Sequence, residues 1–163
     1  MEHRDTLIRV DLALTAVFAF TAWHSAIVFT TPAQWIGAVT AMVLFGIGVF
    51  AFLWSYWSAV QRSRTHEIAV TQLYLLMGAA IPGPVRRTMN LALVLQFAVA
   101  IATTLVRPNG PDGNPGSSLA VGFLVPMLGF GLNGLWAVTH GEFSVRSDLR
   151  ESRKEIRQNA DHG

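Results

Sequence analysis

The chain has 163 residues, of which 13% are charged and 52% are hydrophobic, and its formal net charge is +2. A typical soluble domain has about 25% charged residues, so this chain cannot cover a globular surface with polar groups, and much of its apolar surface must face lipid. The absence of cysteine excludes disulfides, thiolate catalysis and iron–sulfur clusters, and the small net charge argues against nucleic acid as a partner.

Two long apolar runs follow the polar N-terminus, at residues 12–29 and 35–60. At 1.5 Å per residue the first run makes about 27 Å of helix, which is enough to cross a membrane. Glu2 and Asp5 precede it and no small-residue cleavage site ends it, so we expect a retained span rather than a signal peptide. The short uncharged linker contains Pro32, which predicts an antiparallel hairpin.

The polar segment 61–87 separates the second run from the third. Within it, residues 65–81 place five apolar side chains at helical spacing beside polar ones: Ala69, Leu73, Leu76, Met77 and Ala80. This pattern predicts a short amphipathic helix that lies on the membrane surface. A re-entrant segment that ends at the Pro-Gly-Pro turn is the alternative.

The second half of the chain contains a third apolar run, 88–106, and a fourth, 119–139. The loop between them, 107–118, is rich in Pro and Gly and predicts a chain of turns. Pro126 is expected to kink the fourth span. The tail, 141–163, carries both charge signs around a narrow apolar stripe, which predicts a helical continuation of the fourth span into water.

The basic residues predict the orientation. If all four runs cross the membrane, eleven of the twelve Lys and Arg residues lie on one side and only Arg107 lies on the other. The eleven are Arg4, Arg9, Arg62, Arg64, Arg86, Arg87, Arg146, Arg150, Arg153, Lys154 and Arg157. Because basic residues stay in the cytoplasm, the sequence predicts an all-α, polytopic integral membrane protein with four transmembrane helices and both termini cytoplasmic. Eleven of the twelve basic residues are Arg, which is typical of a GC-rich bacterial genome. The membrane is therefore expected to be the inner membrane of a bacterium.

Polar groups inside a membrane are functional candidates by default, because each must be satisfied by a partner or by water. Gln96 and Asn133 lie at similar depths in the third and fourth spans. We therefore expect a hydrogen bond between them that fixes helix pairing. A polar path lined by both is the alternative.

His24 and Asp11 are the two candidates in the first span. No second histidine, carboxylate or thiolate lies at the depth of His24, so neither haem nor a metal is expected there. A structural histidine bonded to a hydroxyl or a carbonyl is predicted, with a protonatable gate as the alternative. Asp11 is expected to complement the dipole at the start of its helix, with proton coupling as the alternative.

Small residues at regular spacing are candidates for close helix packing, either within the protein or against a partner helix. The candidates are Ala92, Ala100, Gly129, Gly131 and Gly134. The basic side chains beside the spans are candidates for contact with lipid headgroups or a protein partner. These are Arg62, Arg64, Arg86, Arg87, Arg150, Arg153 and Arg157.

The spans contain no catalytic, nucleotide-binding or metal-binding motif, so no enzyme activity, cofactor or metal is expected. The leading prediction is an accessory or scaffolding subunit of a membrane complex. Such a subunit would act on a protein partner through the 65–81 segment and the tail, and a homo-oligomer within the membrane is the alternative. A small proton-coupled transporter or channel is the alternative, and an enzyme acting on lipid-linked substrates ranks third.

Overall fold

The computed structural model describes residues 2–79, 81–110, 113 and 117–146, with side chains from residue 6 onward. The helices are α1 (Glu2–Val28), α2 (Thr31–Arg62), α3 (Val70–Tyr74), α4 (Gly83–Val106), the 3₁₀ helix η1 (Ser118–Leu124) and α5 (Pro126–His140). Four helical stretches are long and apolar enough to cross a membrane, namely Thr6–Val28, Thr31–Arg62, Gly83–Val106 and Ser118–His140. The expectation of an all-helical chain with four helices long and apolar enough to span a membrane is confirmed.

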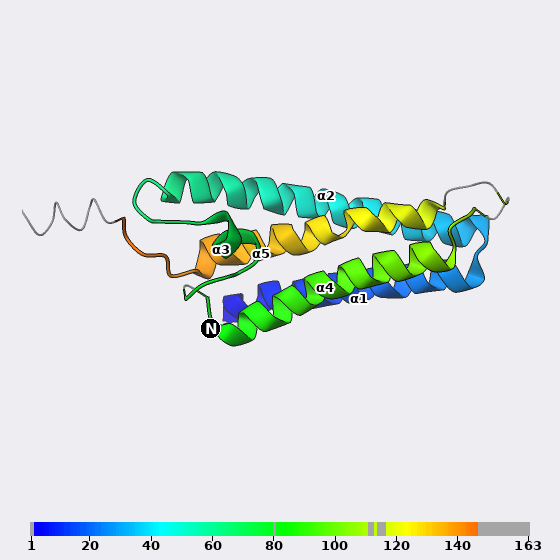
Figure 1. Ribbon diagram of the computed structural model, residues 1–163, viewed down its shortest axis with the longest axis horizontal. Coiled ribbons are helices and arrows are strands. Elements are labelled where there is room, and N and C mark those ends of the chain that lie inside the picture. The colour runs from blue at the N-terminus through cyan, green and yellow to red at the C-terminus, as the bar shows by residue number, and fades with distance from the viewer. Residues whose placement is uncertain (1, 80, 111–112, 114–116, 147–163) are drawn as a thin grey trace, which may run out of the picture.

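The helices form an elongated bundle in which α1 lies beside α4, and α2 lies beside η1 and α5 (Figure 1). Within each pair the two helices run in the same direction, and the two pairs run in opposite directions. The helix α5 also contacts α1, α3 and α4. In its span 61% of the most apolar stretch is buried inside the protein, against 22% to 39% in the other three, so the fourth span is the centre of the bundle. We call the end that holds α3 the α3 end (Figure 1).

The helices are longer than the apolar runs that predict them. The helix α1 begins at Glu2, ten residues before the run starts at Leu12, and α4 begins at Gly83, five residues before Thr88. Hydropathy marks the stretch that lipid can surround, whereas backbone hydrogen bonding continues through the polar residues at its edge. Consequently Asp11 is the tenth residue of its helix.

The fourth span changes helix type at the residue where a kink is predicted. It begins as the 3₁₀ helix η1 and continues as α5 from Pro126. The Val125 amide donates to the Gly122 carbonyl over 3.0 Å, in the pattern of a 3₁₀ turn. Proline has no amide hydrogen to donate and is well suited to the first turn of an α-helix. The break is therefore a junction between two helix types.

The predicted surface helix over 65–81 is wrong in its extent, because among the described residues of this segment only Val70–Tyr74 is helical. Leu73 and Leu76 are buried in the core with the side chains of α5, and Leu76 adopts a positive φ of 53° that ends the helix. Leu73 and Leu76 pack on the end of the bundle, whereas Ala69 and Met77 of the same predicted stripe are exposed. A helix with a continuous outward stripe does not form. Ala80 lies outside the described residues.

The predicted helical continuation of the fourth span is also wrong, because α5 ends at His140 and residues 141–146 are not helical. Gly141 is extended, and a Cβ at this position would lie 2.9 Å from the Phe143 ring, which is folded back into the core. The chain then forms an antiparallel bridge with the loop after α2. The Glu67 amide donates to Ser144 over 2.9 Å, and the Arg146 amide donates to Thr65 over 3.1 Å. The rest of the tail lies outside the described residues.

Candidate functional site

A row of buried side chains along α1 faces the interior of the bundle. Asp11, Thr15, Phe18, Ala22 and Ser25 recur every three or four residues, which places them on one side of the helix. Asp11 is 0% exposed, and neither of its carboxylate oxygens has a hydrogen-bond partner within the described part of the chain. A helix dipole acts within the first turn. Because α1 begins at Glu2, the dipole interpretation of Asp11 is wrong.

Gln96 connects α4 to this row. Its Nε2 donates a hydrogen bond of 2.8 Å to the hydroxyl oxygen of Thr15, and both residues are buried. The other end of the amide points toward α5, because a Cβ added to Gly129 would lie 2.9 Å from Oε1 of Gln96. That oxygen has no hydrogen-bond donor among the residues described. Gln96 therefore lies between α1 and α5.

Asn133 joins α5 to α3 and α4. Its Nδ2 donates to the Tyr74 carbonyl over 2.9 Å and to Oδ1 of Asn90 over 3.2 Å. The amide of Asn90 in turn donates to the Leu75 carbonyl over 2.8 Å. Both hydrogens of the Asn133 amide are used, and its Oδ1 has no donor in the described chain. The predicted hydrogen bond between Gln96 and Asn133 is not formed, because each amide bonds other partners.

The ring of Tyr74 lies between α2 and α5, because it stacks on Phe52 and a Cβ at Gly134 would lie 2.8 Å from it. Desolvation by burial raises the pKa of its phenol above the ordinary value of 10.0. The phenol therefore remains neutral at physiological pH.

His24 faces outward. Its side chain is exposed, and its ring stacks on that of Phe20 with the centroids 6.3 Å apart. The prediction of a structural histidine bonded to a hydroxyl or a carbonyl is therefore wrong, since the ring contacts Phe20 instead. Successive residues of a helix are rotated by about 100°, so Ser25 takes the interior position next to it. The Ser25 hydroxyl oxygen lies 2.7 Å from the Ala33 carbonyl and ties α1 to the start of α2.

The predicted packing residues close the protein's own bundle. Ala92 and Ala100 are 3% and 0% exposed on α4. Gly129, Gly131 and Gly134 are buried along α5. A Cβ on Gly131 would meet the backbone of Gly48 in α2, so these two helices approach closely. Sequence spacing alone leaves the choice between self-packing and a partner helix open, and the contacts decide it.

Arg62 differs from the other basic candidates. Its guanidinium donates to the Val138 carbonyl over 2.9 Å and to the Gly141 carbonyl over 3.3 Å, and it lies 5.4 Å from the Phe143 ring centroid. This arginine therefore fastens the end of α5 to the end of α2. Among the other candidates, Arg64 and Arg87 are exposed and Arg86 is half-buried. Arg150, Arg153 and Arg157 lie outside the described residues.

Arg107 fastens the end of α4 to the end of α1 at the opposite end of the bundle. Its position in the sequence does not predict this role. Its Nε donates to the Ala26 carbonyl in the last turn of α1 over 3.1 Å, and its guanidinium lies 4.5 Å from the Phe29 ring centroid. Thr15, Asn90 and Ser25 were missed as well. Each is a small polar residue in an apolar helix, and its partner is distant in sequence or provides only a backbone carbonyl.

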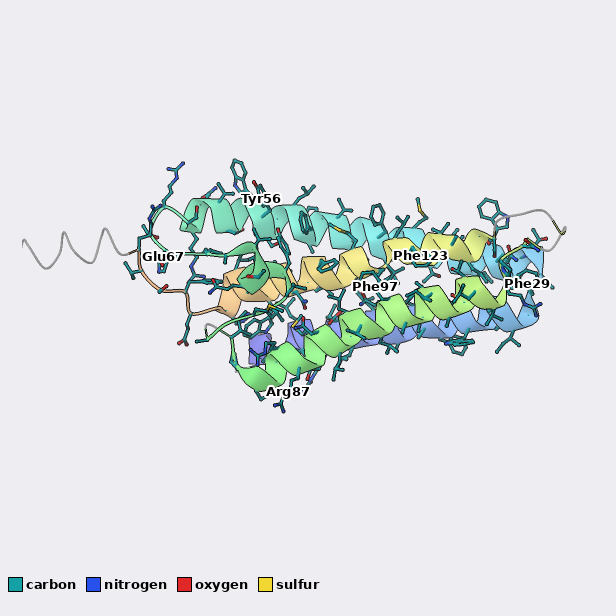
Figure 2. The ribbon with its side chains drawn as sticks, viewed as in Figure 1. Phe29, Tyr56, Glu67, Arg87, Phe97 and Phe123 are labelled. Carbon is teal, nitrogen blue, oxygen red and sulfur yellow. The ribbon has the colours of Figure 1, made fainter. Side chains whose placement is uncertain are left out.

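A polar cavity and an apolar groove at the α3 end are lined by α3 and its neighbours. A polar cavity of about 580 Å³ is lined by the loop after α2, by α3 and by the bridged tail, including His66, Glu67, Ala69, Gln72 and Ser144. Figure 2 shows Glu67 in this loop, beyond the end of α2. An apolar groove of about 470 Å³ lies between the last turns of α2 and α3. Within the described chain no group of three or more His, Cys, Asp or Glu residues is arranged to hold a metal ion.

Comparison of the chain with models of protein families, with curated proteins and with solved structures finds no significant match in any of the three.

Proposed function

We propose that this protein is a non-enzymatic accessory or scaffolding subunit of a membrane complex, in the inner membrane of a bacterium. The observation that carries the proposal is the construction of the α3 end. There the loop after α2, the short helix α3 and residues 141–146 are held together by backbone pairing and by Arg62. A fixed surface of this kind is suited to recognition of a protein, because little conformational freedom is lost on binding.

We place this surface in the cytoplasm, together with both termini. The support is the eleven-to-one distribution of basic residues, which the positive-inside rule assigns to the cytoplasmic side. The polar cavity beside His66 and Glu67 then faces water and is accessible to a soluble domain or to the cytoplasmic part of another membrane protein. Close packing of α2 on α5 through Gly48 and Gly131 favours a static frame for this surface.

Site-specific photo-crosslinking in cells tests the accessory role. A crosslinking residue at position 69, in the exposed wall of the cavity, should capture one protein in a defined stoichiometry. The matched control is position 91, where Leu91 is 67% exposed on α4 and is expected to face lipid. Equal capture at both positions, or capture of only a second copy of this chain at position 69, would contradict the accessory role.

A small proton-coupled transporter or channel is the second candidate, and Asp11 is the observation that favours it. A fully buried, unpartnered carboxyl group in a spanning helix is a recognised element of proton relays. Purified protein in vesicles should then carry a proton flux that Asp11→Asn abolishes. Identical flux in the two proteins would remove this candidate.

A further inference from the structure

Unsatisfied acceptors gather on three neighbouring helices. Both carboxylate oxygens of Asp11 on α1, Oε1 of Gln96 on α4 and Oδ1 of Asn133 on α5 lack a donor within the described chain. All three residues are 0% exposed. A buried polar atom is almost always hydrogen-bonded, so several such atoms in one bundle require an explanation.

These acceptors lie within one layer of the bundle that is about 6 Å thick. Thr15 bonds Gln96, and Gln96 faces Gly129, so these three residues mark one level. Asp11 precedes Thr15 by four residues, and Asn133 follows Gly129 by four, which is about 6 Å along each helix. Because α1 and α5 run in opposite directions (Figure 1), both steps lead toward the α3 end. Asp11 and Asn133 therefore lie at the same depth.

The donors of the two amides are already engaged. Asn133 uses its amide group on Tyr74 and Asn90, and Gln96 donates to Thr15, so both oxygens remain as acceptors. An ionised Asp11 would add only acceptors to this layer, whereas a protonated carboxyl group supplies one O–H donor. One proton therefore removes a buried charge and satisfies an amide oxygen at the same time.

No described basic side chain compensates a charge at Asp11. On its own helix Arg9 is exposed. Among the helices packed on α1, the charged or titratable residues are Arg62 and Tyr56 on α2, Arg86 and Arg87 on α4, and His140 on α5, while η1 has none.

The basic groups among these lie at the ends of their helices. Arg62 bonds the carbonyls at the end of α5, and the His140 ring stacks on Trp136 with the centroids 5.4 Å apart. Arg86 and Arg87 lie in the first turn of α4, and Figure 2 shows Arg87 at the lower edge of the bundle.

We propose that Asp11 is a proton-binding site in the interior of the bundle, where its carboxyl group is held as the neutral acid and donates to an amide oxygen of α4 or α5. The ligand is a proton, and the site is independent of the accessory role proposed above. Its test is spectroscopic, so the site and the accessory role can fail separately. Within the transporter alternative, the same site would be the coupling group.

Infrared spectroscopy of the purified full chain in mild detergent at pH 7 tests the site. Exposed carboxyl groups are ionised at this pH, so a carbonyl band of a protonated carboxylic acid should come from Asp11 alone. The band should be present in the native protein and in Glu142→Gln, which removes an exposed carboxylate, and it should be absent in Asp11→Asn. A native protein without this band would overturn the proposal.

Thermal unfolding provides a second readout that does not depend on assigning a band. If the folded state holds one more proton than the unfolded chain at neutral pH, stability falls as the pH rises. The native Tm should therefore decrease between pH 6 and pH 8 more steeply than that of Asp11→Asn, whose amide supplies a permanent donor. Parallel pH profiles, or a native Tm that depends on sodium at constant pH, would overturn the assignment of a proton.

Discussion

Arg62 and Arg107 compensate the carboxyl ends of paired helices at opposite ends of the bundle. Arg62 lies in the last turn of α2, and Arg107 caps the end of α4. Each donates to a carbonyl near the end of the helix that runs parallel to its own. The last carbonyls of a helix lack intrahelical donors and carry partial negative charge, and two parallel helices place two such ends side by side. One arginine neutralises part of this charge and satisfies the orphan carbonyls.

Replacement of Arg62 by Ala should therefore destabilise the protein by about 1.5 to 3 kcal/mol, the range for hydrogen bonds that involve a charged group. Arg64→Ala is the matched control, because Arg64 is exposed two residues further on, and its effect should stay within about 0.5 kcal/mol. Thermal unfolding in mild detergent, followed by circular dichroism, measures both. Equal losses would show that Arg62 does not stabilise the end of α5.

The bond between Gln96 and Thr15 permits a test of the polar contacts inside the bundle. In a double-mutant cycle, Gln96→Leu and Thr15→Val should be coupled by about 0.6 to 2 kcal/mol. Gln96→Leu and Asn133→Leu should be closer to additive, because these two amides bond different partners. Unfolding in detergent provides the free energies. Stronger coupling in the second pair would support the hydrogen bond between Gln96 and Asn133 that the sequence predicts.

Among the elements, the contact between α2 and α5 decides how tightly the bundle closes. Gly48 of α2 lies against the backbone at Met127 and Leu128, and Gly131 of α5 lies against Gly48 and Ala51. Side chains are missing where the two backbones meet, so the helices gain contact area along their length. In lipid, where apolar burial between helices contributes little, such contact is a main source of association.

Glycine at position 48 should therefore be far less replaceable than glycine at position 46, although both lie on α2. A Cβ at position 48 would collide with the α5 backbone, whereas a Cβ at position 46 has nothing within 4 Å. Gly48→Ala should lower the Tm or prevent folding. Gly46→Ala should be neutral or stabilising by up to about 1 kcal/mol, the gain in helix propensity. Similar Tm values for the two variants would argue against close contact at Gly48.

For the whole molecule, the distribution of charge and the arrangement of helices lead to one topology. Four spanning helices bring the α3 end and the chain after α5 to the same side as the start of α1 (Figure 1). The loop after Arg107 emerges at the other end. An even number of spans with basic residues at one end predicts a single orientation.

A topology reporter fused after Gly163 should therefore read cytoplasmic, and one inserted at Gly113 should read external. Gly113 lies in the loop between α4 and η1, so the insertion leaves all four spans intact. Reversal of charge at Arg86 and Arg87 should increase the fraction with inverted orientation. Two reporters on the same side would refute four spans.

The sequence by itself determined the number of candidate spans and the all-helical class. Apolar runs and prolines act through the local solvent and backbone, which do not depend on the rest of the fold. The tertiary structure decided which side of a helix faces inward, since His24 and Ser25 are neighbours in sequence yet His24 is exposed and Ser25 is buried. It also decided the hydrogen-bond partners of the buried polar side chains, because Gln96 bonds Thr15, a residue 81 positions away. Asp11 is at the edge of an apolar run in the sequence, and only helix extension and packing around α1 bury its carboxyl group, which has no hydrogen-bond partner among the described residues.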